Sequence, residues 1–503
     1  MTPPAPEAPF VLTLDVGTSS ARALLFDGAG RAVPDFETRR SYRPRATADG
    51  GGDFDPAELT AAVEDLLDEA AVRAERFSPA AVACCTFWHS LMGVDAAGEP
   101  VTPLYTWADL RSAAEARSLR ASLDEAAYHE RTGCFLHPCY HPAKLRWIAR
   151  TQPDVFARAA RWVSFGEFLY ARWFGRFRAT VSMASATGLL DVRSCLYDEE
   201  ILRAAGVRQE QLSPLGDVGD AFRGLRPEGA RRWPALRDLP WFPPVGDGAC
   251  NNLGAGAVTP ERAGVMVGTS GALRVVVPAE RLGALPGLFA YRVDRRRGVV
   301  GGALNDGGNL IEWARRTFRL PEEAEREVAG MEPDAHGLTF LPLLAGERSP
   351  GWAADARGAI VGLRMATRPV EILRAAMEAV ACRFRLILRR LEGVREAVAS
   401  GGALLRSSAW MQILADALGV PVAASEEPEA SCRGAALLAL EALGKVGRLE
   451  DLPARTGRRF EPDPARHARY ARATERQERY YARLISENPQ GAPAGGTPFT
   501  HVG

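Results

Sequence analysis

The stretch VLTLDVGTSSARALLFD, Val11–Asp27, places one carboxylate, Asp15, in an apolar run directly ahead of the polar cluster Gly17–Ser20. The apolar residues on both sides of this cluster predict two strands, over 11–16 and 21–26, joined as a hairpin. Two interpretations of the turn are open. It can be an ordinary hairpin turn with a solvated Asp15, or a backbone cradle for phosphate with a metal-directed carboxylate beside it.

The same pattern returns half a chain later. The stretch VMVGTSGALRV, residues 265–275, repeats the VGTS of the first hairpin at Val267–Ser270, with Met266 in the place of Asp15. A repeat at half the chain length, flanked by strand patterns in both copies, predicts two structurally related domains. We expect each domain to present one polar hairpin, so that phosphates can lie between them with the acidic side on the first copy.

Domain boundaries follow from composition. A chain of 503 residues is too long for one core. The segment 244–264 is rich in Gly, Asn and small residues, as domain junctions are, and predicts a boundary near residue 257. The domains are therefore expected at 10–257 and 258–487. The Pro/Gly-rich ends, 1–9 and 488–503, are expected to be disordered.

The overall composition excludes several partners. The chain is 47% hydrophobic and 25% charged, and its 62 Lys and Arg residues balance 62 Asp and Glu residues. It therefore lacks the basic field that draws nucleic acid or anionic lipid. No signal peptide and no apolar run of about 18 residues is found, so a cytoplasmic protein without a membrane segment is expected. Eight sparse cysteines predict free thiols.

Lysine usage excludes two classes of ATP-dependent enzyme. Lys144 and Lys445 are the only lysines in the sequence. Neither stands in G-x-x-x-x-G-K-[ST] or in V-A-I-K, which excludes a P-loop NTPase and a eukaryotic-type protein kinase. If the protein handles ATP, groups other than a lysine must hold the phosphates.

A third glycine site follows a long helix predicted over 370–391. In AVASGGALLRSSAWMQILADALGVPV, residues 397–422, a short strand runs into Gly401-Gly402, and Ser407 or Ser408 would cap the helix that follows. Glycines at a strand-to-helix turn allow a flat ligand or a phosphate to approach the backbone closely, although tight packing would explain them as well.

These three glycine sites in this order, with GDGA between the first two, resemble the FGGY family of carbohydrate kinases. The stretch GAIVGLRMATRPVEILRAAMEAV, which begins at Gly358, fits the C-terminal family signature beside GERSP at 346–350. KLRWI at 144–148 fits the N-terminal signature. The resemblance implies an α/β fold of two related actin/Hsp70-like (ribonuclease H-like) ATPase domains that flank a central catalytic cleft.

Within the family, the chain is most similar to the gluconokinase branch. The similarity lies in HSLMGVD (89–95), WADLRS (107–112), GDGACNNLGAG (246–256) and LPLLAGERSPGWAADARGAIVGL (341–363). It implies transfer of the γ-phosphate of Mg-ATP to D-gluconate, with 6-phosphogluconate as product. Xylulose, ribulose, glycerol or another polyol are alternative substrates, and an actin- or Hsp70-like ATPase acting on a protein partner is a further alternative. A small sugar or sugar acid is thus the expected partner, and a homodimer is compatible with the resemblance.

The resemblance also implies the site residues. The ATP-binding residues, from the two hairpins and the adenosine site, are Gly17, Thr18, Ser19, Arg22, Gly268, Thr269, Ser270, Gly308, Gly401 and Gly402. The general base is Asp247, which also contacts the substrate together with His89, Trp107 and Asp109. Asp15 is expected to orient Mg²⁺ through water, because Mg²⁺ gives up its waters reluctantly. Glu312 stands where some relatives carry Gln in the nucleotide pocket.

A loop rich in Cys and His and a set of basic residues also need an interpretation. The run GCFLHPCYHP brings Cys134, His137, Cys139 and His141 within eight residues, but ligands so close together in a proline-stiffened loop cannot easily surround a tetrahedral zinc ion. We expect a loop beside the sugar pocket instead. The carboxylate of gluconate would need a cationic partner, for which the candidates are Arg111, Arg348 and Lys144.

Overall fold

The computed structural model describes residues 5–486. The tail expected to be disordered, 488–503, lies outside them, as do residues 1–4. Residues 5–9 were also expected to be disordered, but the structure describes them. The backbone of Glu7 accepts a hydrogen bond of 2.8 Å from Gly28, which holds this segment beside the turn that follows the first hairpin.

The first domain is built on a five-stranded sheet of order β14-β6-β1-β2-β3. The hairpin strands β1 and β2 are antiparallel, whereas β6 runs parallel to β1 and β14 parallel to β6. Helix α1 (Pro56–Ala74) packs against β2 and β3. The strands are β1 (Val11–Val16), β2 (Ser20–Phe26), β3 (Ala32–Ser41), β6 (Ala81–Thr86) and β14 (Val245–Gly246).

The second domain repeats this arrangement in a seven-stranded sheet of order β17-β18-β16-β15-β21-β22-β23. Its central five strands lie in the order β18-β16-β15-β21-β22. Neighbouring strands in this series pair in the same directions, antiparallel or parallel, as those in the series β3-β2-β1-β6-β14 of the first sheet. This confirms the predicted pair of related domains. The strands are β15 (Arg262–Val267), β16 (Gly271–Pro278), β17 (Phe289–Arg292), β18 (Arg297–Leu304), β21 (Glu396–Ser400), β22 (Val422–Ser425) and β23 (Thr456–Phe460).

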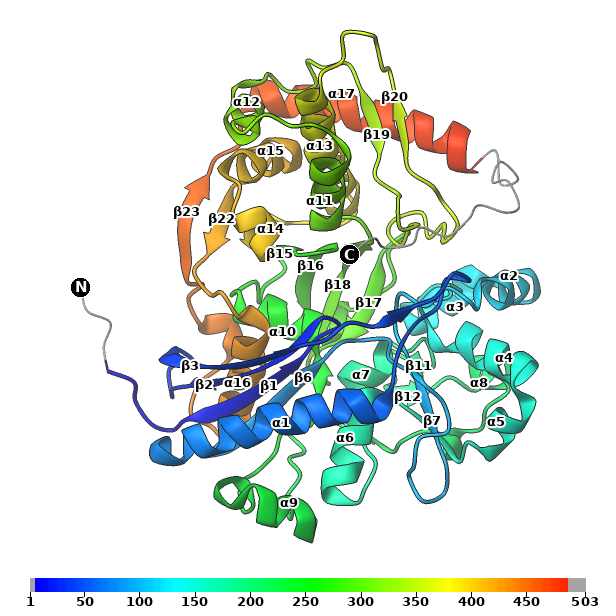
Figure 1. Ribbon diagram of the computed structural model, residues 1–503, viewed down its shortest axis with the longest axis vertical. Helices are drawn as coiled ribbons and strands as arrows, with labels where there is room; N and C mark the ends of the chain where they lie inside the picture. Colours follow the sequence, from blue (N-terminus) through cyan, green and yellow to red (C-terminus); the bar gives the residue numbers. More distant parts are fainter. Residues whose placement is uncertain (1–4, 487–503) are drawn as a thin grey trace.

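Helices cover the second sheet in the upper half of Figure 1. The helix predicted over 370–391 is α13, which ends three residues earlier than expected and packs against α11, α15 and α17. The remaining elements of this domain are α11 (Gly308–Thr317), α12 (Ala324–Gly330), α13 (Pro369–Leu388), α14 (Gly402–Leu405), α15 (Ser408–Leu418), α17 (Pro464–Tyr481), β19 (Thr339–Leu341) and β20 (Ala359–Val361).

A long insertion between β6 and β14 supplies most of the first domain's remaining elements. Its helices are α2 (Ala113–Ser122), α3 (Glu125–Thr132), α4 (His141–Thr151), α5 (Pro153–Arg158), α6 (Phe165–Phe174), α7 (Val181–Ser185), α8 (Glu199–Ala205) and α9 (Pro227–Arg232). The short strands of this domain are β4 (Arg45–Ala46), β5 (Gly52–Phe54), β7 (Met92–Val94), β8 (Leu104–Tyr105), β9 (Arg161–Val163), β10 (Ala179–Thr180), β11 (Leu190–Asp191), β12 (Leu196–Tyr197) and β13 (Leu215–Gly216).

Two helices cross between the domains. Helix α10 (Asp247–Gly254) follows β14 and contacts β15 and β16 of the second sheet, whereas α16 (Ala430–Ala442) follows β22 and packs on β1 and β6 of the first. In Figure 1 the orange α16 accordingly lies beside the blue strands. The helices meet backbone to backbone, because a Cβ on Gly254 would lie 1.8 Å from the Ala430 oxygen and one on Gly434 would lie 1.9 Å from the Cys250 oxygen.

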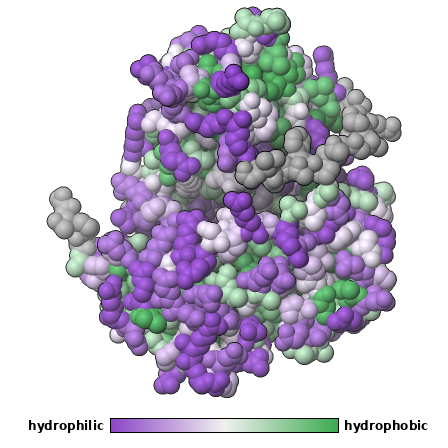
Figure 2. Space-filling model, in the orientation of Figure 1, coloured by the Kyte–Doolittle hydropathy of each residue, from purple (hydrophilic) through white to green (hydrophobic). Residues whose placement is uncertain are grey.

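The face of the molecule shown in Figure 2 is dominated by hydrophilic residues, with apolar side chains in small separate groups. Within residues 5–486, none of the helices has both the length and the apolar character needed to cross a membrane.

The close contact between α10 and α16 predicts an effect on the stability of the protein. Gly434→Ala should lower the free energy of unfolding by about 1–3 kcal/mol, because the added methyl group overpacks a backbone contact, although alanine is the better helix former. Gly330→Ala is the matched control, since Gly330 is also helical and a Cβ there meets nothing within 4 Å. Thermal melts of both variants test this, and equal melting temperatures would contradict the proposed close crossing.

Candidate active site

The two polar hairpins occupy equivalent positions in the two sheets. The backbone N–H of Gly17 donates to the Ser20 oxygen at 3.0 Å, and that of Gly268 donates to the Ser270 oxygen at 3.0 Å. The remaining turn residues of both hairpins are exposed or half-buried, so their N–H and hydroxyl groups are accessible. Such groups are suited to hold phosphate oxygens.

The glycines predicted for the adenosine site converge on the second hairpin. Gly308, at the start of α11, donates its N–H to the Gly268 oxygen at 2.9 Å. Gly401 has φ of +90°, and a Cβ there would lie 2.4 Å from the Val267 oxygen. Gly402 begins α14 directly afterwards. Three distant segments therefore meet at the end of β15 by close backbone contact, which explains the glycines. Glu312 is exposed on α11, one turn beyond Gly308.

Asp15 is buried beside the first hairpin. Its Oδ1 accepts a hydrogen bond from the Cys85 thiol at 3.4 Å, and its Oδ2 lies 3.7 Å from the Arg22 Nε. Burial raises the pKa of Asp15 to about 6, while the nearby Arg22 opposes the shift and Asp247 adds to it. A hard carboxylate with few protein donors fits water-mediated contact with Mg²⁺.

Arg22 also pairs with Glu429, which directly precedes α16, so both halves of the chain supply charges at the first hairpin. Sequence reasoning missed Glu429. Its only signal was the acid-rich run EEPEA at 426–430, which does not indicate that α16 crosses to the first sheet.

Asp247 begins α10 at the end of β14. Gly246 pairs with Thr86, which in turn pairs with Val16, so Asp247 and Asp15 lie at the same edge of the first sheet. Burial raises the pKa of Asp247, and the positive charge of Arg274 is the main opposing influence. A carboxylate beside the phosphate hairpins is suitably placed to accept a proton from a substrate hydroxyl.

A small cavity between the domains lies near Asp247. It is lined by Trp88, His89, Cys139, Tyr140, Arg274, Phe289, Tyr291, Ala303, Arg348 and Trp352. The Nδ1 of His89 lies 2.6 Å from the Ala186 oxygen, and burial holds the pKa of His89 well below its usual range. The imidazole is therefore neutral, with Nδ1 donating and Nε2 able to accept from a ligand.

Neither Trp107 nor Asp109 lines this cavity. The Trp107 ring lies under the Arg348 guanidinium, with 4.6 Å from Cζ to the ring centre. Asp109 accepts a hydrogen bond from the Gly52 N–H at 3.1 Å and forms an ion pair with Arg111. Direct contact of Trp107 and Asp109 with the substrate stays a prediction.

The three cationic candidates have different surroundings. Arg111 is paired with both Asp53 and Asp109. Lys144 donates to the Pro138 oxygen at 2.5 Å, and burial lowers its pKa to about 8. Of the three, only Arg348 lines the cavity.

The loop 134–142 lies beside the cavity, where Cys139 and Tyr140 contribute to the lining. The Cys134 thiol of this loop donates to the Ser185 oxygen at 3.4 Å. The ring of Trp352, from the second domain, lies 5.4 Å from His137 and 5.8 Å from Tyr140. The loop thus forms part of the wall that both domains build around the pocket.

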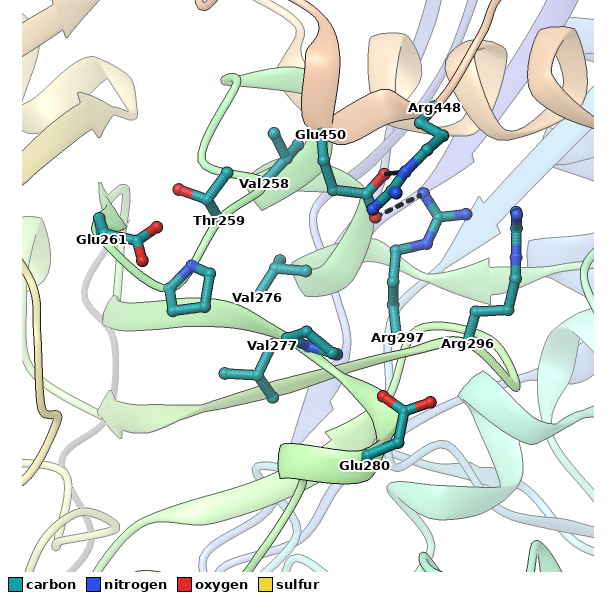
Figure 3. Close-up of a pocket in the computed structure, with 12 residues that line it drawn as sticks. Val258, Thr259, Glu261, Val276, Val277, Glu280, Arg296, Arg297, Arg448 and Glu450 are labelled. Atoms are coloured by element: carbon teal, nitrogen blue, oxygen red, sulfur yellow. Dashed lines mark ion pairs between the residues drawn. The ribbon is translucent and has the colours of Figure 1, made fainter.

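A larger cavity, of about 570 Å³, lies away from these residues (Figure 3). It is bordered by Val258–Glu261, which connects α10 to β15, and by Arg448 and Glu450, which follow α16. Glu450 lies 3.6 Å from Arg448 and 3.8 Å from Arg297. None of the predicted site residues borders this cavity, so it marks the connection between the domains rather than the catalytic cleft.

Two related domains, each with a polar glycine hairpin at the same place in its sheet, define the actin/Hsp70-like fold. The model of the FGGY family of carbohydrate kinases, N-terminal domain, matches residues 10–254, and that of the C-terminal domain matches residues 263–443. The chain belongs to the FGGY family of carbohydrate kinases.

Its relatives include more than one substrate specificity. A gluconokinase of Bacillus subtilis (strain 168) is 28% identical over 90% of this chain and 92% of its own length. The structure of a gluconate kinase from Lactobacillus acidophilus has a TM-score of 0.89 at 26% identity, covering 96% of this chain and 99% of that one. A ligand-bound xylulose kinase from the same organism has the same TM-score and identity, covering 96% and 100%.

The position of Asp247 predicts a selective effect on turnover. Asp247→Asn should lower kcat by about 10²–10⁴-fold, as loss of a general base does, because the substrate hydroxyl then lacks its proton acceptor. Binding of ATP and sugar, measured by calorimetry, should stay close to that of the unmodified protein. A kcat within a few-fold of the unmodified protein would contradict the assignment.

The raised pKa of Asp15 predicts a pH-dependent metal requirement. Because the carboxylate is protonated below about pH 6, the Mg²⁺ concentration for half-maximal rate should rise as the pH falls through 6. Asp15→Asn should show a high requirement at every pH. Mg²⁺ titrations between pH 5 and 8 measure this, with Asp247→Asn as the comparison. An unchanged requirement in Asp15→Asn would rule out the metal-directed role.

Proposed function

We propose that this FGGY kinase transfers the γ-phosphate of Mg-ATP to a hydroxyl of a sugar acid, most simply the C6 hydroxyl of D-gluconate, giving 6-phosphogluconate. The observation that carries the choice of an acid over a neutral sugar is the environment of Arg348 in the interdomain cavity.

Arg348 is held in place by neutral groups alone. Its Nε donates to the Asn305 Oδ1 at 2.7 Å and its Nη2 to the Leu304 oxygen at 3.2 Å. No carboxylate among the described residues lies within ion-pairing distance of it, whereas Arg111 has two such partners. A desolvated cation without a counter-charge is costly. The carboxylate of a sugar acid would supply that charge, whereas a neutral sugar would not.

The other groups then divide the reaction between them. The hairpins hold the β- and γ-phosphates from two sides, and Arg22 adds positive charge. Asp247 accepts the proton of the attacking hydroxyl, while His89 offers Nε2 to a hydroxyl of the sugar. Bound Mg²⁺, held through water by Asp15, would neutralise charge on the phosphates.

Xylulose, ribulose and glycerol are the alternative substrates within the family, and relatives with different specificities are about equally similar to this chain. These compounds carry no carboxylate, so they would leave Arg348 without a counter-charge. The alternative of a protein-directed ATPase receives no support from the family match.

Steady-state kinetics with gluconate and D-sorbitol test the proposal most sharply. Sorbitol has a hydroxymethyl group in the place of the carboxylate and is otherwise matched. We expect kcat/KM to favour gluconate by roughly 100-fold or more, since a site built around a polar partner discriminates strongly. A higher kcat/KM for xylulose, ribulose or glycerol than for gluconate would contradict the proposal.

Substitution of the arginine gives a second test. Arg348→Met keeps the length of the side chain but removes the charge, so KM for gluconate should rise by roughly 10–100-fold, the loss of about one charge-assisted contact. The preference for gluconate over sorbitol, measured as the ratio of kcat/KM values, should become smaller as well. Arg357→Met is the matched control, because Arg357 is exposed in the same loop region. Equal KM values in the two variants would remove Arg348 from substrate binding.

A further inference from the structure

Arg274 lies on β16, four residues beyond the second phosphate hairpin. Its neighbours in register are both glycines, Gly264 on β15 and Gly301 on β18. The Asn252 side chain of α10 donates to the Arg274 backbone oxygen at 3.0 Å. The residue therefore lies where α10 packs on the second sheet, and it is only 7% exposed.

The guanidinium of Arg274 has no partner among residues 5–486. Its Nε and Nη1 are buried without a hydrogen bond, and no carboxylate lies within 4.0 Å. Two other buried arginines of this chain have carboxylate partners, Arg297 with Asp294 and Arg374 with Glu378. An unsatisfied buried guanidinium costs free energy, which indicates that a ligand completes its contacts.

The direction of the side chain shows where that ligand would lie. A Cβ on Gly248, the residue after the general base, would lie 2.9 Å from the Arg274 Nη2. Arg274 also lines the interdomain cavity that contains Arg348. Asp247 is the charged group that acts most strongly on Arg274, whereas Arg348 is hydrogen-bonded to Asn305 and lies over the Trp107 ring. Arg274 thus lies beside Asp247, and Arg348 lies beside Asn305 and Trp107.

We propose that Arg274 is a catalytic residue whose guanidinium donates hydrogen bonds to oxygens of the phosphoryl group during transfer. In this step the hydroxyl loses its proton to Asp247 and forms a bond to the γ-phosphorus. The bond from that phosphorus to the bridging oxygen breaks, and ADP leaves with the electron pair. Arg274 keeps its protons throughout, and its planar fork matches two phosphoryl oxygens.

This role follows from the position of Arg274 beside Asp247. The hydroxyl that reacts must lie at Asp247, so the anion beside Asp247 is the phosphoryl group, and the carboxylate of a sugar acid lies toward Arg348. The inference rests on the proposed transfer at Asp247, but it does not depend on which sugar the enzyme prefers. It also accounts for the absence of a phosphate-binding lysine, since only Lys144 and Lys445 are present.

The test combines turnover with binding, using whichever sugar the unmodified enzyme phosphorylates best. Arg274→Ala should lower kcat by about 10³-fold or more, as removal of an arginine that stabilises the transferred phosphoryl group does. The Kd of the sugar, measured by calorimetry without nucleotide, should change by less than about threefold. Retained sugar binding also shows that the variant is folded.

Chemical rescue separates a catalytic role from a structural one. Guanidinium chloride at concentrations well below those that unfold the protein should raise kcat of Arg274→Ala by at least tenfold, because the cation can occupy the vacated space. It should leave the exposed control Arg357→Ala unchanged.

Two results would overturn the inference. A kcat of Arg274→Ala within tenfold of the unmodified enzyme would show that the group does not act in the transfer step. A loss confined to sugar affinity, with kcat preserved, would make Arg274 a ligand of the substrate carboxylate instead. Failure of the gluconate proposal would appear separately, as a preference for a neutral sugar in the unmodified enzyme.

Discussion

The backbone contact between α10 and α16 is the constraint on which the rest of the structure depends. It requires glycine at 254 and 434, because a side chain on either helix would push the other away. Through it, α10 carries Asp247 from the first sheet toward the second, while α16 brings Glu429 from the second half to Arg22 on the first hairpin. Each domain thereby supplies groups to the other's part of the cleft.

The charged residues of the cleft are distributed according to what each part of the cleft must bind. Asp15 and Arg22 lie at the first hairpin, Asp247 and Arg274 lie between the domains, and Arg348 lines the same cavity as Arg274 and lies over Trp107. Carboxylates thus stand where a metal or a proton must be held, and arginines stand where anions must be held. With only two lysines in the chain, arginine performs every cationic role in this account, and its fork suits both phosphate and carboxylate.

Much of this could be predicted from the sequence, because the features concerned are local. The hairpin around Asp15 and its copy at Gly268–Ser270 are visible as strand patterns around a glycine turn, and the resemblance then supplied Asp247. Arg274 and Glu429 were missed. Arg274 stands beside three valines in a strand and Glu429 stands directly before a helix, and a charged residue in either setting has no local signature of function. Their roles depend on how α10 and α16 cross, which involves contacts between residues far apart in the chain.

The most direct test of the account is a crystal structure of the protein with gluconate and a non-hydrolysable ATP analogue. We expect the gluconate carboxylate within hydrogen-bonding distance of Arg348, its C6 hydroxyl at Asp247, and the terminal phosphate of the analogue between the two hairpins, facing Arg274. A gluconate bound in the reverse direction, with its carboxylate at Asp247 or away from Arg348, would contradict it.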